Sequence, residues 1–213
     1  MLFGKNSTLV MIGDSITDCG RARPVGEGDG LGGGYANLVN ALLTAKFPHD
    51  NIKVLNTGIS GDTVLSLKAR WQSDVIDLSP DYLSIMIGVN DVWRKFDSDG
   101  GAGHVPLAEY ESVYRELIAR TKSKVKKIIL ITPFLAETDK NEPMAAMLAD
   151  YIAAVKKIAA DENLLLVDMQ AVIDEYITDG ICPKAIAGDR VHPSAVGSMI
   201  IAKAFLKICG IDI

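Results

Sequence analysis

A serine stands at a chemically suggestive position near the start of the chain, in the stretch Gly13-Asp14-Ser15. These residues directly follow the apolar run at 9–12 and are too polar to continue a buried strand. A serine at such a corner could lie in an ordinary turn, accept a phosphate group, or act as a nucleophile at the rim of a sheet. A nucleophilic serine needs a base that is itself oriented by a third group.

Three histidines could supply that base. His49 precedes the second apolar run, which places it at the opposite edge of a parallel sheet. His104 follows the third run, on the correct edge, and is therefore an alternative base. However, its glycine-rich segment, 100–104, offers no fixed acid to orient the ring. His192 follows Asp189 by three residues, and the carboxylate can bind one ring nitrogen while the other faces the serine. The alternative to this catalytic role is that Asp189 caps a helix and His192 is an ordinary surface residue.

Two other turns carry hydrogen-bond donors for a developing oxyanion. Gly61 closes the stretch NTGISG, where the absence of a side chain lets a backbone amide approach closely. Asn90, in the stretch GVND, offers a side-chain amide. Glycine and asparagine are also common turn residues. Each of the turns that carry Ser15, Gly61 and Asn90 is by itself weak evidence for an active site. All three on one rim, together with an Asp-x-x-His pair, are strong evidence for one.

The elements that would position these residues are predicted by alternating patterns. Nearly continuous apolar runs are typical of parallel strands covered on both faces, and they recur at 9–12, 52–55, 82–87, 128–131 and 164–167. Helical spacing recurs between them, at 64–78, 107–118 and 144–158, and Pro193 is placed to open a last helix. The alternation predicts one α/β domain, residues 1–213, with a doubly wound parallel sheet and helices on both faces. Ligands bind such sheets at the carboxyl ends of the strands. In a strand order 2-1-3-4-5, Ser15 and Asn90 follow neighbouring strands.

The segment 20–34 is too long and glycine-rich for an ordinary connection, and it is therefore either a functional loop or a disordered one. It contains no phosphate-binding glycine motif, which disfavours a nucleotide site. Because the segment leaves the strand that carries Ser15, we expect Arg21 to contact substrate. Trp93 could stack on a sugar ring, or else belong to loop packing or a subunit contact. Asp14 is a further candidate for substrate contact, with a structural hydrogen-bonding role as the alternative.

Composition narrows the class of protein. The net charge of −5 argues against a nucleic-acid partner, and the basic run at 122–127 is typical of a helix carboxyl terminus. No apolar run is long enough to span a membrane, and no export signal is recognisable. Three cysteines, an odd number without metal-like spacing, favour a reducing, cytoplasmic location and predict no metal. No cofactor is expected, and a homo-oligomer remains open.

Four blocks, GDSIT, NTGISG, GVND and DRVHP, resemble those of the GDSL or SGNH hydrolase superfamily and occur in the family order. The one departure is Ile16-Thr17, where the name of the family has leucine. The resemblance implies a three-layer, flavodoxin-like fold and a catalytic triad of Ser15, His192 and Asp189. It also implies an oxyanion hole made by the backbone amides of Ser15 and Gly61 and the side chain of Asn90.

The longer start, GDSITDCGRARPVGEG, resembles the branch that contains intracellular acetylxylan esterases. This implies a serine esterase that removes acetyl groups from a small acylated sugar, such as an acetylated xylo-oligosaccharide. An acyl thioesterase or a lysophospholipase could use the same triad. A non-catalytic receiver-like domain shares the topology, but Gly88 ends the third strand where a receiver needs aspartate, and no lysine follows the fifth. A non-catalytic carbohydrate-binding remnant would lack members of the triad.

Overall fold

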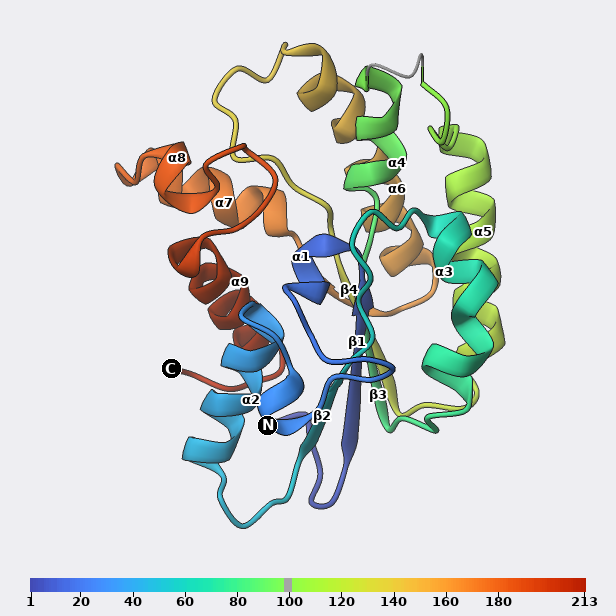
Figure 1. The fold of residues 1–213 in the computed structure, drawn as a ribbon, viewed down its shortest axis with the longest axis vertical. Coiled ribbons are helices and arrows are strands. Elements are labelled where there is room, and N and C mark those ends of the chain that lie inside the picture. The colour runs from blue at the N-terminus through green and yellow to red at the C-terminus, as the bar shows by residue number, and fades with distance from the viewer. Residues whose placement is uncertain (98–100) are drawn as a thin grey trace.

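Five parallel strands form the centre of the protein (Figure 1). The computed structural model describes residues 1–97 and 101–213, so Gly100 of the glycine-rich segment lies outside the described residues. The strands are β1 (Thr8–Gly13), β2 (Lys53–Asn56), β3 (Tyr82–Met86), β4 (Lys127–Ile131) and β5 (Leu165–Val167). Their order is β2-β1-β3-β4-β5, which confirms the predicted topology.

Strand β1 pairs with β2 on one side and with β3 on the other, so the direction of winding reverses there. Gly13 at its end lies opposite Met86 at the end of β3. The residues that follow these two strands therefore leave the sheet side by side, at its carboxyl edge.

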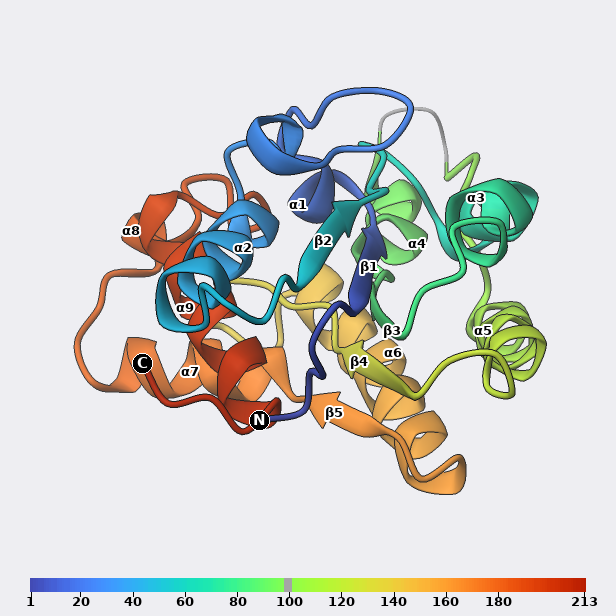
Figure 2. The same cartoon turned by 90° about the horizontal axis from the view of Figure 1, so that it is seen from below.

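Helices cover both faces of the sheet, which makes three layers (Figures 1 and 2). One face carries α2 (Tyr35–Lys46), α7 (Met169–Thr178) and α9 (Ala195–Ile208); the other carries α3 (Val64–Trp71), α5 (Leu107–Thr121) and α6 (Pro143–Asp161). Shorter helices follow β1 and β3, namely α1 (Ser15–Asp18) and α4 (Val89–Trp93), and α8 (Pro183–Ile186) precedes α9. The flavodoxin-like prediction is thus confirmed.

Two helix boundaries differ from the predicted ones. The helix predicted over 64–78 consists of α3 and a π-helical turn, Gln72–Ile76. The last helix begins at Ala195 rather than at Pro193, because Ser194 is its N-cap and accepts hydrogen bonds from the amides of Val196 and Gly197. Pro193 instead lies in the turn that carries His192.

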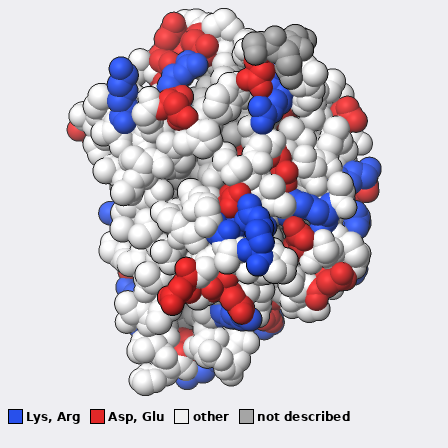
Figure 3. Space-filling view, in the orientation of Figure 1, with Lys and Arg blue, Asp and Glu red and all other residues white. Residues whose placement is uncertain are grey.

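One cluster of buried apolar side chains extends through the described residues, from Phe3 to Ile211. We therefore propose that residues 1–213 make a single domain. Among the described helices, none has both the length and the hydropathy to cross a lipid bilayer. Acidic and basic side chains are interspersed over the face seen in Figure 3.

Candidate active site

Ser15, His192 and Asp189 form a continuous chain of hydrogen bonds at the carboxyl edge of the sheet. Ser15 begins α1 directly after β1, and its Oγ lies 2.9 Å from Nε2 of His192. Nδ1 of the same ring lies 2.6 Å from Oδ2 of Asp189. An ionised carboxylate can only accept hydrogen bonds, so Nδ1 of the neutral imidazole carries the proton. Nε2 is then free to accept the hydrogen bond of the serine hydroxyl.

The Asp189 carboxylate is well suited to orient the ring. Its second oxygen, Oδ1, accepts hydrogen bonds from the backbone amides of Val191 at 3.0 Å and His192 at 2.8 Å. Partial burial opposes ionisation of Asp189, but the hydrogen bonds from the side chain and backbone of His192 and from the amide of Val191 outweigh it. They lower the pKa of Asp189 to about 2. The carboxylate is therefore ionised at neutral pH.

Asp14 faces the interior rather than the open side of the site. It is the N-cap of α1, and its Oδ1 accepts a hydrogen bond from the Ile16 amide at 3.0 Å. Burial raises the pKa of this carboxyl to about 7, although the Ile16 hydrogen bond and the nearby His192 act in the opposite direction. This placement favours the structural role that the sequence offered as the alternative, and a direct contact of Asp14 with substrate finds no support here.

The turn that contains Gly61 lies next to α4. Gly61 adopts φ +86°, in the left-handed region where glycine is favoured. Asn90 is buried, and its Nδ2 donates to the backbone carbonyl of Asp62 at 3.0 Å. A carboxamide has two N–H donors, so this bond leaves one for a ligand. The structure thus brings Gly61 and Asn90 together.

Two buried aspartates, Asp18 and Asp91, hold the same turn in place, and no pattern in the sequence indicates either role. Asp18 accepts hydrogen bonds from both the amide and the hydroxyl of Ser60 at 2.9 Å, and it pairs with Arg23 at 2.7 Å. Asp91 accepts a hydrogen bond from the Val64 amide at 2.9 Å. Because Ser60 precedes Gly61 and Val64 begins α3, the turn is held at both ends.

The segment 20–34 packs against the end of β2. Gly26 forms an isolated bridge with Asn56, and Arg21 is buried. The guanidinium of Arg21 donates to the carbonyl of Gly58 at 2.6 Å and to carbonyls within its own loop. The sequence predicts that Arg21 contacts substrate, but that expectation finds no support in this arrangement, since Arg21 holds the loop to the Gly58 turn.

Trp93 and His104 occupy different places relative to His192. The ring of Trp93 lies against that of His192, with centroids 5.8 Å apart and an angle of 53° between the rings. Nδ1 of His104 lies 2.7 Å from the backbone carbonyl oxygen of Asp91. Among the described residues, His192 is the histidine within hydrogen-bond distance of Ser15. The geometry therefore favours His192 over His104 as the partner of the serine.

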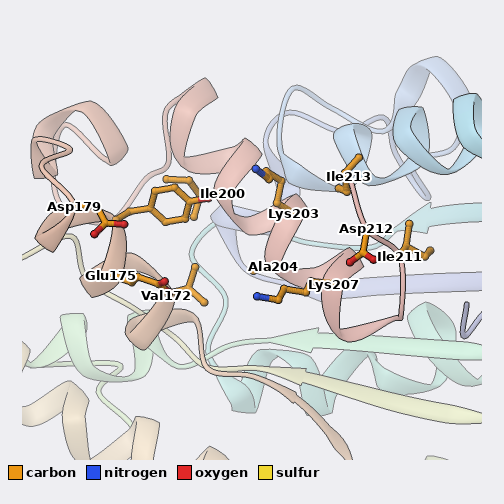
Figure 4. A pocket seen from close by; sticks show the side chains of 11 residues that line it. Val172, Glu175, Asp179, Ile200, Lys203, Ala204, Lys207, Ile211, Asp212 and Ile213 are labelled. Carbon is orange, nitrogen blue, oxygen red and sulfur yellow. The ribbon is translucent and has the colours of Figure 1, made fainter.

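A pocket of about 350 Å³ lies elsewhere, between α7, α9 and residues 211–213 (Figure 4). Lys203 and Lys207 extend along it from α9. The described residues that line it include none of the predicted site residues. Within the described part of the chain there is also no group of three or more His, Cys, Asp or Glu side chains that could hold a metal ion.

A serine, a histidine and an aspartate joined in this way at the carboxyl edge of a flavodoxin-like sheet define a class of serine hydrolase. Residues 11–200 match the GDSL-like lipase/acylhydrolase family. The chain belongs to this family, and it is a carboxylic ester hydrolase of the GDSL/SGNH type.

Relatives that match almost the whole chain include an acetylxylan esterase and an α/β-hydrolase enzyme. The chain is 50% identical to an acetylxylan esterase from Geobacillus stearothermophilus, over 100% of this chain and 98% of the relative. A crystal structure of that esterase superposes with a TM-score of 0.95, again covering 100% and 98% of the two chains. An α/β-hydrolase enzyme from the metagenome of Lake Arreo, Spain, is 43% identical, with a TM-score of 0.93 and coverage of 99% and 98%.

Solved structures of the Geobacillus esterase include three described as catalytic mutants, in which a serine, a histidine or an aspartate is replaced by alanine. The aspartate and the histidine of that enzyme are three positions apart, as Asp189 and His192 are here.

Proposed function

We propose that this protein is a serine esterase that removes acetyl groups from acetylated xylo-oligosaccharides. The observation that carries the proposal is the continuous hydrogen-bonded chain from Ser15 through His192 to Asp189 at the edge of the sheet. The full-length similarity to an acetylxylan esterase supports the choice of substrate.

In the proposed acylation step, Ser15 Oγ attacks the acetyl carbonyl carbon while its proton passes to His192 Nε2. Asp189 stabilises the resulting imidazolium through Nδ1 and remains ionised throughout. The negative charge that develops on the carbonyl oxygen is met by the amides of Ser15 and Gly61 and by the free N–H of Asn90. Collapse of this intermediate breaks the bond to the sugar oxygen, which takes the proton from Nε2 and leaves as a hydroxyl group.

Deacylation follows the same steps with water as the nucleophile in place of Ser15. His192 Nε2 takes a proton from a water molecule, the resulting hydroxide equivalent attacks the acetyl carbon, and the same donors stabilise the second oxyanion. The bond to Ser15 Oγ then breaks, and Oγ regains its proton from Nε2. Acetic acid leaves and gives its proton to solvent to become acetate, and the enzyme returns to its starting state.

On the substrate side, we propose that Trp93 contacts the sugar, because its partly exposed ring lies beside His192, where the leaving group must depart. The segment 20–34, which follows α1, contains four charged side chains, of which Arg21 is buried, and only two large apolar ones, Val25 and Leu31. Leu31 is buried, so it adds no exposed apolar surface. This surface suits a hydroxyl-rich leaving group better than a long acyl chain.

The test is a comparison of kcat/KM for acetyl, butyryl and octanoyl esters of one alcohol, and for acetylated xylosides against acyl-coenzyme A thioesters. We expect the acetyl ester and the acetylated xyloside to be the best substrates. One methylene group is worth only about 1–3 kcal/mol in an apolar pocket, so the preference is graded rather than absolute. A kcat/KM that rises up to eight carbons would replace this proposal with a lysophospholipase or a thioesterase.

We also propose a cytoplasmic location. Cys19, Cys182 and Cys209 are free, and Cys209 is buried. Free cysteines fit a reducing compartment, in which disulfides are rare.

A further inference from the structure

We propose that Arg70 is a positioning residue for the reaction, which holds the strand end that carries Ser15 and the turn that carries Gly61 in one fixed arrangement. The proposal rests on the proposed function, in which Ser15 is the nucleophile and Gly61 supplies an oxyanion donor. Arg70 itself lies on α3 and contacts neither residue directly.

The guanidinium of Arg70 joins three separate segments at the carboxyl edge of the sheet. Nη2 donates to the carbonyl of Gly13 at 3.1 Å, the last residue of β1. Nη1 donates to the carbonyl of Thr57 at 2.6 Å, directly after β2. Nε donates to Oδ2 of Asp62 at 2.7 Å.

These acceptors lie close in sequence to the groups that the mechanism needs. Gly13 is two residues before Ser15, and Asp62 directly follows Gly61. The backbone carbonyl of Asp62 is also bound by Asn90, at 3.0 Å. The Gly61 turn is therefore held from one side by α4, through Asn90, and from the other by α3, through Arg70.

The surroundings of Arg70 favour a rigid link. Its side chain is 14% exposed, and that of Asp62 is 13% exposed. Nη1 also pairs with Oδ2 of Asp74 at 2.6 Å, one turn along the helix. Burial raises the pKa of Asp62, and the charge and hydrogen bond of Arg70 oppose that rise. A planar guanidinium can direct several donors at fixed angles, whereas lysine offers one compact ammonium group on a flexible stem.

Removal of this link would let the Gly61 amide move relative to Ser15. A displacement of about 1 Å at a catalytic group can cost about 10²-fold in rate. An oxyanion donor stabilises the transition state, so its displacement is expected to lower kcat and to leave KM nearly unchanged.

The experiment compares Arg70→Met and Arg70→Lys with Arg115→Met as the matched control. Arg115 lies on α5, and its side chain is 28% exposed and paired with two carboxylates, Glu111 and Asp161, both at 2.7 Å. The control therefore removes an arginine that is ion-paired in a similar way but is not linked to the site.

For Arg70→Met we expect a fall in kcat of about 10- to 100-fold, with little change in KM. Arg70→Lys restores little of it, because one ammonium cannot reach all three segments. Arg115→Met keeps kcat. The loss of Arg70 also adds little to the loss caused by Asn90→Ala, because both residues act on the same turn.

The proposal is overturned if kcat of Arg70→Met stays within about twofold of the Arg115→Met value, or if only KM changes. Should Arg70→Met fail to fold, Asp62→Ala keeps the arginine and removes its contact with the turn, and the same fall in kcat is then required. The proposed function has its own test, Ser15→Ala. If that variant keeps full activity, the function is wrong; if it is inactive while Arg70→Met is unimpaired, only the role of Arg70 is wrong.

Discussion

Replacement of Asp18 by asparagine should destabilise the protein by an amount that depends on pH. Its side chain is 4% exposed. Burial opposes ionisation, but the hydrogen bonds from Arg23 and from the amide and hydroxyl of Ser60 lower the pKa of Asp18 from 3.8 to about 2. The difference, 3.8 − 2 = 1.8, corresponds to about 2 kcal/mol at about 1.36 kcal/mol for each pKa unit.

The sign follows from the direction of the pKa change. A carboxyl with a lowered pKa in the folded protein contributes stability that is complete above its unfolded pKa of 3.8 and is lost as the pH falls through 2. At pH 7 we therefore expect Asp18→Asn to lower the free energy of unfolding by about 2 kcal/mol. By pH 3 the difference from the wild type should have shrunk to roughly half.

The assay is urea unfolding of the wild type and of Asp18→Asn at pH 7, 5 and 3. Thermal unfolding at pH 7 gives a second measure, with an expected decrease in Tm of about 4–8 °C for a chain of this length. Asp29→Asn is the control, because Asp29 is exposed in the neighbouring loop and such changes usually stay within about 0.5 kcal/mol. A difference that is the same at pH 7 and pH 3, or absent at pH 7, would refute the reasoning.

Three further predictions concern the reaction. Ser15→Ala should keep the fold and only the residual rate that binding and oxyanion donors provide, and a fluorophosphonate probe should label Ser15; labelling of another residue would contradict the assignment. His192→Ala should abolish turnover while His104→Ala retains most of it, because Nε2 of His192 must accept the proton of the serine hydroxyl; the reverse order of the two variants would assign the base to His104. Asn90→Ala should lower kcat by about 10²–10³ with little change in KM, whereas a raised KM with unchanged kcat would make Asn90 a substrate-binding residue.

The strands and the positions of the main site residues were predictable because they depend on local patterns. Strands covered on both faces must be apolar throughout, so the runs at 9–12 and 128–131 stand out in the sequence. Once the sheet is parallel, Ser15 and Asn90 must follow strand ends at one edge. Asp189 and His192 lie in a single turn, so their contact also follows from short-range spacing.

The supporting residues were not predictable, because their partners are backbone groups far away in the sequence. Arg70 donates to the carbonyl of Gly13, 57 positions away, and Asp18 accepts from Ser60, 42 positions away. Backbone carbonyls and amides occur at every residue, so no pattern of residue types indicates which ones a side chain will meet. Arg21 shows the same difficulty, because a charged residue in a glycine-rich loop indicates exposure, whereas the Gly58 carbonyl draws it inward.

The site has two halves, the turn that carries His192 and the part that carries Ser15 and the Gly61 turn. Each half is held in place by its own set of contacts. The histidine turn is tied to the segment after β4, where the Ala136 amide donates to the carbonyl of Arg190 at 2.9 Å and Glu137 pairs with the side chain of Arg190 at 3.0 Å. The serine half is tied through Asp18, Arg70 and Asn90 to the Gly61 turn. The two halves meet at the hydrogen bond between Ser15 and His192, residues that are 177 positions apart. Loss of a brace on one half should therefore leave the internal geometry of the other intact and lower kcat through the alignment of Oγ with Nε2 and the oxyanion donors.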